Sequence, residues 1–328
     1  MDFSFFKKTL FLLVLTPVFL NAQYTDVINS NRPGRAVSAY AVGKNVVQAE
    51  AGLFYEQQDN VDLNSDSNIF GTDMALRYGL FFEELEINWE GSFMKQNINY
   101  PDFGIEGKLA DFSRNRLGVK YLVYDPYKNP ERNKPNLYSW RANNLFQWKN
   151  LIPAVSLYGG VNFVLGDNPF YPGEPTTSYR GAVATQSRLS PRFVLISNVA
   201  YDRIGTDFPE WRYALSLSHA LRDPRWSIFF EGQGISGDRY SDVILRTGVA
   251  RLLSPDFQVD LHMGSGFKND PSRLFVVLGA SYRLDFHKDS FKTIDPMSSG
   301  NSNGKIKRNS NKKKSKKRKK KNKDEIDF

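Results

Sequence analysis

The sequence predicts an all-β transmembrane protein, an antiparallel β-barrel of about 12 strands, and three observations lead to this fold class. An export signal opens the chain, the last amphipathic strand ends in an aromatic residue at Phe286, and long and short connections alternate between the strands. A soluble β-sandwich has strands that alternate in the same way. It does not need these three features together, so they favour the membrane barrel.

The first 22 residues have the composition of a signal peptide. Lys7 and Lys8 supply a short cationic region, Leu10–Leu20 is apolar, and Ala22 precedes the expected cleavage site. The apolar stretch is too short to span a bilayer comfortably. The chain has no cysteine, which excludes a lipid-modified N-terminus, disulfides and thiolate metal sites, and fits export.

The body of the chain consists of segments of about ten residues in which apolar and polar residues alternate. In the last of them, Leu274, Val276 and Leu278 share one face, whereas Arg273 and Arg283 lie on the other. Side chains at positions i and i+2 of a strand point the same way, so one face suits lipid and the other suits water. The alternating segments lie near residues 47–55, 70–79, 84–93, 116–123, 155–165, 178–189, 192–202, 211–218, 225–234, 242–251, 257–263 and 273–286.

Connection lengths indicate which end of the barrel faces the periplasm. Residues 56–68, 97–110 and 166–177 are polar and are expected to be long outer loops. Ser190-Pro191 and Arg222-Asp223-Pro224 are expected to be tight inner turns, because Pro fixes φ and Asp bonds its own backbone. Both termini of an even-stranded barrel then face the periplasm.

One inner connection, residues 125–150, is long and rich in proline. Its part from Tyr138 to Trp148 is expected to form either a short amphipathic periplasmic helix or an extra hairpin. The sequence leaves both alternatives open.

Six charged residues are expected to point into the lumen: Arg77, Glu86, Glu90, Arg116, Lys120 and Arg283. Pairing of the third and fourth strands would bring the two glutamates near Arg116 and Lys120. Mixed signs on neighbouring strands favour ion-pair ladders that fill the lumen, whereas rings of one sign would favour ion selectivity. A 12-stranded barrel is only somewhat wider than one that side chains can fill, so any pore is narrow.

The sequence contains no pattern that indicates catalysis. His219, His262 and His287 have no spacing typical of metal ligation. Gly234-Ile235-Ser236-Gly237 lacks the nucleophile-elbow form. We therefore expect no enzymatic activity, no cofactor and no metal.

The residues after the barrel, 287–328, carry 15 basic and 5 acidic side chains, whereas the body is close to neutral. Because the tail has too few apolar residues to fold, we expect it to be disordered. Export makes nucleic acid an improbable partner, and a periplasmic tail would meet peptidoglycan or acidic periplasmic and outer-membrane proteins; a solvated tail without a partner is the alternative. The basic cluster consists of Lys312, Lys313, Lys314, Lys316, Lys317, Arg318, Lys319, Lys320, Lys321 and Lys323.

The last strand resembles the signal by which the barrel-assembly machinery engages its clients. Apolar residues alternate through Tyr282 and Leu284 and close on Phe286, where the alternation stops. The alternative is that Phe286 belongs only to the aromatic belt at the membrane interface. The chain continues for 42 residues beyond this aromatic, where most such barrels stop.

Several segments resemble an outer-membrane barrel family, the one described as "putative MetA-pathway of phenol degradation". They are Asn31-Arg32-Pro33-Gly34-Arg35, the first strand Val46–Gly52, the stretch Arg116–Tyr121 and the strand from Pro153 to Leu165. The resemblance covers roughly residues 28–286 and departs from the commoner family form between Arg35 and Gly43. It implies a transporter-like barrel, and the family description names aromatic compounds without fixing a substrate.

Together these features predict four parts: a signal peptide (1–22), a periplasmic N-terminal segment or plug (23–44), an outer-membrane barrel (45–286) and a basic periplasmic tail (287–328). The function we expect is a narrow passive channel in the lipids of the outer membrane of a Gram-negative cell, for small, hydrophobic or aromatic molecules. The alternative is an accessory subunit of a larger outer-membrane complex that docks partners through its periplasmic segments.

Overall fold

A computed structural model describes residues 27–128, 133–268 and 270–287, and these form a closed barrel of 12 antiparallel strands. The predicted fold class and strand number are confirmed. The strands are β1 (Val46–Asn60), β2 (Ser65–Gly79), β3 (Leu85–Tyr100), β4 (Ile105–Tyr124), β5 (Ala154–Phe163), β6 (Thr177–Arg188), β7 (Phe193–Ile204), β8 (Glu210–Ala220), β9 (Trp226–Gly237), β10 (Asp242–Ser254), β11 (Phe257–Gly266) and β12 (Ser272–Asp285).

The barrel is an up-and-down meander in which each strand pairs with its neighbours along the chain. It closes where β1 pairs with β12, in a register that sets Val46 opposite Asp285 and Gly52 opposite Gly279. Closure satisfies the backbone hydrogen bonds of the first and last strands, as the apolar interior of a bilayer requires.

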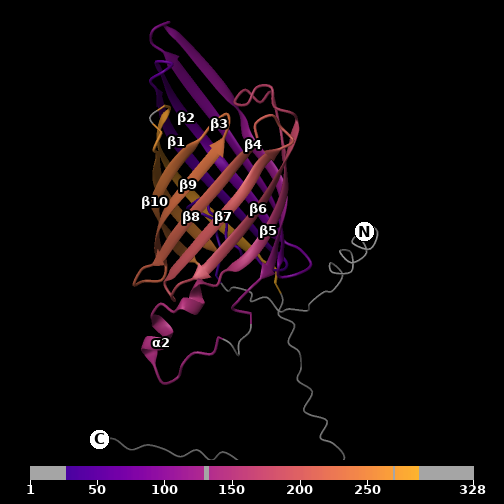
Figure 1. Ribbon diagram of the computed structural model, residues 1–328, viewed down its shortest axis with the longest axis vertical. Helices are drawn as coiled ribbons and strands as arrows, with labels where there is room; N and C mark the ends of the chain where they lie inside the picture. The colour runs from indigo at the N-terminus through magenta and orange to yellow at the C-terminus, as the bar shows by residue number, and fades with distance from the viewer. Residues whose placement is uncertain (1–26, 129–132, 269, 288–328) are drawn as a thin grey trace, which may run out of the picture. The chain divides into compact units, whose positions relative to one another are not determined.

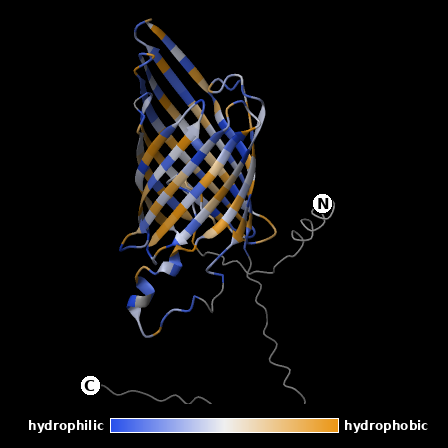
Figure 2. Cartoon of the chain, viewed as in Figure 1, coloured by the Kyte–Doolittle hydropathy of each residue, from blue (hydrophilic) through white to orange (hydrophobic). Residues whose placement is uncertain are grey.

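The strands place apolar side chains outside and polar side chains inside, the reverse of a soluble protein. On β1, Gln48 and Glu50 are buried inside the barrel, whereas Leu53 and Tyr55 are exposed on its outer face. The hydropathy colours alternate for this reason along the strands at the front of the barrel (Figure 2). An apolar outer face with a polar interior is the arrangement of a barrel surrounded by lipid.

The two ends of the barrel differ in their connections (Figure 1). We call the end that carries Val46 and Asp285 the terminal end, and the opposite end the distal end. At the terminal end most turns are short, as between β7 and β6 or β11 and β10. At the distal end the β3–β4 hairpin rises above the other strands, since β5 pairs with β4 only from Arg116 onward.

Long loops were predicted at three places, and the predictions for residues 56–68 and 97–110 are wrong. β1 and β2 continue through the first to a turn at residues 61–64, and β3 and β4 continue through the second to a turn at 101–104. Antiparallel backbone pairing continues there although both faces carry polar side chains, because pairing needs no apolar face once the strands leave the membrane. The third, residues 164–176, is a loop.

The long connection at the terminal end contains helix and no additional strand among its described residues. A short α-helix, α2, spans Trp140–Asn144, and a 3-10 helix spans Trp148–Leu151. Of the two alternatives for this segment, the helix is therefore the one that the structure contains. No helix in the described ranges is long and apolar enough to cross a membrane.

The expected signal peptide, the basic cluster and all of the tail after His287 lie outside the described residues.

Candidate functional site: the barrel lumen

Residues 28–45, which we call the luminal segment, run inside the barrel before β1 begins. Ala36, Ser38, Ala39 and Val42 are all at most 5% exposed. The segment forms no helix or strand, so its backbone N–H and C=O groups need partners from the wall. Polar side chains on the inner faces of the strands supply many of them, and side chains of the segment itself supply others, such as Asn31 for the backbone N–H of Ser38.

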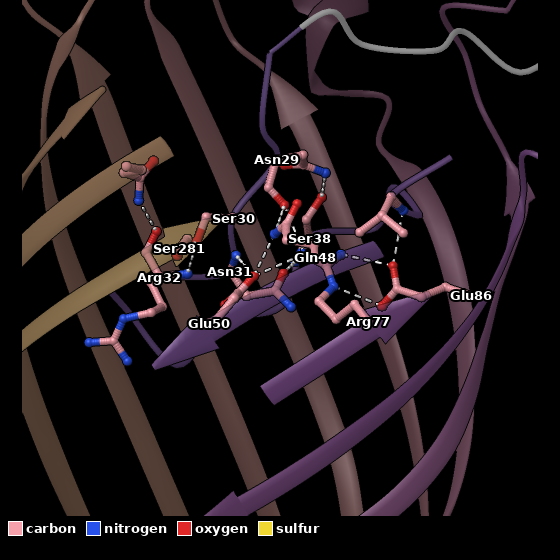
Figure 3. Close-up of polar contacts among 12 residues, drawn as sticks. Asn29, Ser30, Asn31, Arg32, Ser38, Gln48, Glu50, Arg77, Glu86 and Ser281 are labelled. Carbon is pink, nitrogen blue, oxygen red and sulfur yellow. Dashed lines mark hydrogen bonds and ion pairs between the residues drawn. The ribbon is translucent and has the colours of Figure 1, made fainter. Parts of the chain in front are cut away.

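On one side the segment is held by β1 and β2 (Figure 3). The backbone oxygen of Asn29 accepts hydrogen bonds from Arg77 Nη1 at 2.8 Å and from Gln48 Nε2 at 3.1 Å. The backbone N–H of Asn31 donates to Glu50 Oε1 at 3.2 Å, and Glu50 also accepts from Arg77. Arg77 and Glu50 thus bond the segment and each other across β1 and β2, whereas Gln48 bonds the segment and Glu50 on its own strand.

Across the lumen the segment is held by β9 and β7. Glu231 Oε2 accepts from the backbone N–H groups of Arg35 and Ala36, both at 2.9 Å. Asn198 accepts from the backbone N–H of Val37 at 2.6 Å and donates to its carbonyl at 2.9 Å. Because these partners lie opposite β1 and β2, the segment crosses the lumen rather than following one wall.

Near the terminal end the segment meets β3 and β4. Lys120 Nζ donates to the backbone oxygens of Ser38 at 3.1 Å and Tyr40 at 3.0 Å. The backbone N–H of Val42 donates to Glu86 Oε2 at 3.1 Å. Burial raises the pKa of the Tyr40 phenol, which stays protonated and donates to Asp125.

Arg32 extends from the segment to β11. Its Nε and Nη2 donate to the two oxygens of Asp260 at 3.0 and 3.1 Å, a bidentate pair. The guanidinium lies over Gly52 and Gly279, where any Cβ atom would collide with it. These two glycines face each other across the β1–β12 closure, so the missing side chains leave a groove for the arginine.

The inward charges predicted from the sequence lie in three places. Arg77 Nη2 and Lys120 Nζ contact Glu86 Oε2 at 2.8 and 3.3 Å, and all three side chains are at most 1% exposed. Glu90 lies 3.2 Å from Arg116 on the next strand. The strand register sets Glu86 opposite Lys120 and Glu90 opposite Arg116.

The sixth residue, Arg283, is apart from the others. It pairs with Asp256 at 2.8 Å in the β10–β11 turn at the terminal end. It therefore ties the last strand to a turn rather than contributing to the ladder across β3 and β4.

Sequence reasoning missed a second set of luminal charges: Arg35, Asp73, Arg114, Asp202, Glu231 and Arg246. Glu231 and Arg246 face each other across β9 and β10, and simple alternation on these strands could have found that pair. Arg114 could also have been found, because it shares the face of Arg116 on β4 and lies, like Arg116, on the terminal side of the bulge that shifts the β3–β4 register between Ser92 and Phe93. A shift of one residue exchanges the two faces of a strand only beyond the bulge.

Cavities lie beside the luminal segment, and two of them are lined by described residues on several strands. The distal cavity, of about 620 Å³, runs from Arg35 to the loops at the distal end, where Glu174 and Arg239 line it. The side cavity, of about 150 Å³, lies between the segment and the wall and reaches Lys120 toward the terminal end. Both are lined by Arg35, Asp73, Arg114, Arg116, Arg212 and Gln233.

Residues 30–284 match the family described as "Putative MetA-pathway of phenol degradation". The chain belongs to this family. The match spans most of the chain and includes the luminal segment from Ser30 onward together with nearly all of the barrel, so the predicted resemblance is confirmed. No curated protein matches the chain.

Among solved structures, the chain is similar to the COG4313 outer membrane channel from Pseudomonas putida F1, with a TM-score of 0.51 and 9% identity over 78% of this chain and 100% of that one. At this identity the likeness establishes the shared fold. The NanC porin matches with a TM-score of 0.45 and 9% identity over 72% and 100% of the two chains. The CymD monoaromatic hydrocarbon channel matches with 0.40 and 10% identity over 75% and 90%.

The three histidines of the protein lie in separate places. His219 stacks on Phe193 with 4.1 Å between ring centroids, His262 lies 3.8 Å from Asp260 inside the barrel, and His287 follows the last strand. Within the described ranges no group of three His, Cys, Asp or Glu residues could hold a metal ion.

The residues of the expected assembly signal lie on the outer face of the last strand. Tyr282, Leu284 and Phe286 are 50%, 44% and 62% exposed. The backbone N–H of Phe286 donates to the carbonyl of Asn45, so this aromatic lies where the barrel closes. Recognition by the assembly machinery stays a prediction.

Proposed function

We propose that this protein is an outer-membrane channel for small molecules, with a path that the luminal segment narrows. The observation that carries the proposal is the distal cavity of about 620 Å³ inside a closed barrel with an apolar outer face. Sites that take small molecules have volumes of roughly 300–1,000 Å³. A barrel that only anchored partners would not need such a space.

The luminal segment determines how wide the path is. It crosses the lumen between the distal cavity and the terminal end, and the side cavity continues past it as far as Lys120. Solutes that cross would therefore pass beside the segment, along the inner faces of β3 and β4, or require its displacement. Either route restricts passage to small solutes.

The orientation that fits this role places the terminal end in the periplasm. Bacterial barrels have short periplasmic turns and longer extracellular connections. Here the short turns lie at the terminal end, and the extended β3–β4 hairpin lies at the distal end. The distal cavity would then open toward the outside of the cell.

Planar-bilayer recording of the purified full chain tests the proposal. We expect discrete, stable conductance steps from protein whose folding is verified by heat-modifiable gel mobility. The absence of steps from folded protein, and also from a folded variant that lacks residues 29–42, would overturn the channel. The deletion variant distinguishes a barrel that has no path from a channel that the luminal segment keeps closed.

A second function, docking as an accessory subunit, is favoured by one feature. Tyr138, Trp140 and Trp148 in the terminal-end connection are 100%, 77% and 81% exposed. Aromatic residues are the side chains that most often dominate protein interfaces. If this function is correct, replacing the three by serine removes copurifying subunits while conductance stays unchanged.

A further inference from the structure

We propose that Arg35 and Arg114 form a selectivity site for small organic anions, specifically a carboxylate carried on an apolar body. The proposal rests on the channel function above and names the substrate class of that channel. Its evidence comes from the position of the two arginines, their charge balance, their free donors and their apolar neighbours.

The two arginines lie where the two cavities meet. Arg35 and Arg114 both line the distal cavity and the side cavity. A solute that moves from one cavity into the other therefore passes their guanidinium groups. Their side chains are 38% and 29% exposed, whereas the cluster around Glu86 is fully buried. The two arginines can thus contact a solute, and those at Glu86 cannot.

The carboxylates at this junction are too few to neutralise the arginines. Asp73 alone serves both, with Arg35 Nη2 at 2.5 Å and Arg114 Nη2 at 3.5 Å. Of the described residues that line the side cavity, seven are Lys or Arg and three are Asp or Glu. In the distal cavity the corresponding numbers are eight and five. A narrow path with excess positive charge attracts anions and repels cations.

The neighbouring carboxylates are also already engaged. Asp202 contacts Arg116 at 2.8 Å, Arg180 at 2.5 Å and Arg212 at 3.7 Å. The oxygens of Glu231 accept hydrogen bonds from the backbone of the luminal segment and contact Arg246. Neither carboxylate can therefore compensate for the surplus at Arg35 and Arg114.

Two buried arginine nitrogens, Arg114 Nε and Arg246 Nε, are among the groups that have no hydrogen-bond partner in the described part of the chain. Buried polar groups are normally bonded, and those that are not require an explanation. Both belong to arginines that line the distal cavity. A carboxylate in this cavity has acceptor oxygens for such donors, and guanidinium groups bind carboxylates with matched geometry.

The apolar part of the ligand is indicated by a patch inside the barrel. Ile235, Ile244, Phe275 and Val277 form a buried cluster against Phe54, and all five residues line the distal cavity. The patch adjoins Arg246, whose guanidinium lies 5.2 Å from the centre of the Phe275 ring, and it lines the same cavity as Arg35 and Arg114. A ligand with an apolar body and a carboxylate would contact both surfaces at once.

Recordings of the full chain under a KCl gradient, with benzoate as the probe, test this site. We expect the reversal potential to favour chloride over potassium. Benzoate should reduce the chloride current, whereas neutral benzamide at the same concentration should not. Acetate should block less than benzoate because it lacks the apolar body.

Two variants connect the block to the named residues. In Arg35→Gln/Arg114→Gln the half-blocking concentration of benzoate should rise at least about tenfold, as expected for lost hydrogen bonds to a charged group. Arg35→Lys/Arg114→Lys should keep the preference for chloride and lose part of the benzoate affinity. Arg225→Gln, on an exposed turn of the terminal end, is the matched control and should behave as wild type.

The outcomes separate this inference from the channel itself. Without conductance in the wild type and in the segment deletion, the proposed function fails. With conductance but no chloride preference, or with equal block by benzoate and benzamide, the channel stands and the anion site is wrong. These wild-type measurements decide the question even if the glutamine variant does not fold. A folded glutamine variant with unchanged benzoate block also overturns the assignment.

Discussion

The two halves of the lumen use arginine in opposite ways. In the terminal half, Arg77 is fully buried, bonds Glu50 and Glu86, and holds the luminal segment. In the distal half, Arg35 and Arg114 are partly exposed to the cavities and share one carboxylate, Asp73. A buried arginine whose N–H groups are all bonded has no donor available for a ligand. A partly exposed arginine with too few carboxylate partners still has donors that a ligand can bond.

Charge alone therefore does not identify a selectivity site in a barrel. The terminal half carries as mixed a set of charges as the distal half, and its ion pairs serve to fix the segment. What distinguishes the distal half is the space beside its charges. Substitutions in the two halves should therefore have different effects on conductance and on stability.

Removing the luminal segment should have the largest effect. A variant that lacks residues 29–42 keeps all 12 strands and their closure, so we expect it to fold. Its conductance should exceed that of the wild type several-fold, since the terminal half of the lumen then opens. Single-channel recording measures the change, and unchanged conductance would show that the segment does not restrict the path.

Breaking the terminal ion cluster should reduce stability. Glu86→Gln leaves Arg77 and Lys120 buried beside a neutral amide, at a cost of about 3–5 kcal/mol. Thermal unfolding in detergent, followed by heat-modifiable mobility, should show a clear loss.

The matched control for this cluster is Asp223→Asn in an exposed pair with Arg225. It should change the unfolding temperature little, because water replaces an exposed partner readily. Equal effects of the two substitutions would contradict the structural role of the terminal half.

Filling the groove under Arg32 should have the smallest effect of the three. Gly279→Val places a side chain where the guanidinium lies, and so separates Arg32 from Asp260. One end of the segment is released while Glu231 and Lys120 still hold the rest. We expect modestly raised and noisier conductance, and a smaller loss of stability than for Glu86→Gln, because one buried charge, Asp260, loses its partner rather than two.

The control for the groove is Gly107→Val on the distal hairpin, where a Cβ meets only an ordinary contact with Ile98. Its current should match the wild type. Noise raised to the same extent in both variants would argue against a specific role of the groove.

The fold could be predicted from local pattern because a lipid-facing barrel imposes period-two alternation on every strand. The ion pairs Glu86–Lys120 and Glu90–Arg116 could also be anticipated, since β3 and β4 are consecutive and their inward faces follow from the same alternation. The lengths of the distal loops could not, because a hairpin outside the membrane keeps its backbone pairing without an apolar face to reveal it.

Local sequence pattern was sufficient to predict the barrel, its closure by an aromatic-ended strand and the polar interior. What fills that interior follows from contacts between residues that are far apart in the chain. Arg32 meets Asp260, which is 228 residues away, and the Arg35 backbone meets Glu231 at a separation of 196 residues. Such contacts depend on strand register and on an irregular segment that is held by side chains of several distant strands. None of these leaves a periodic signal in the chain, because periodicity records only which face of a strand a residue occupies.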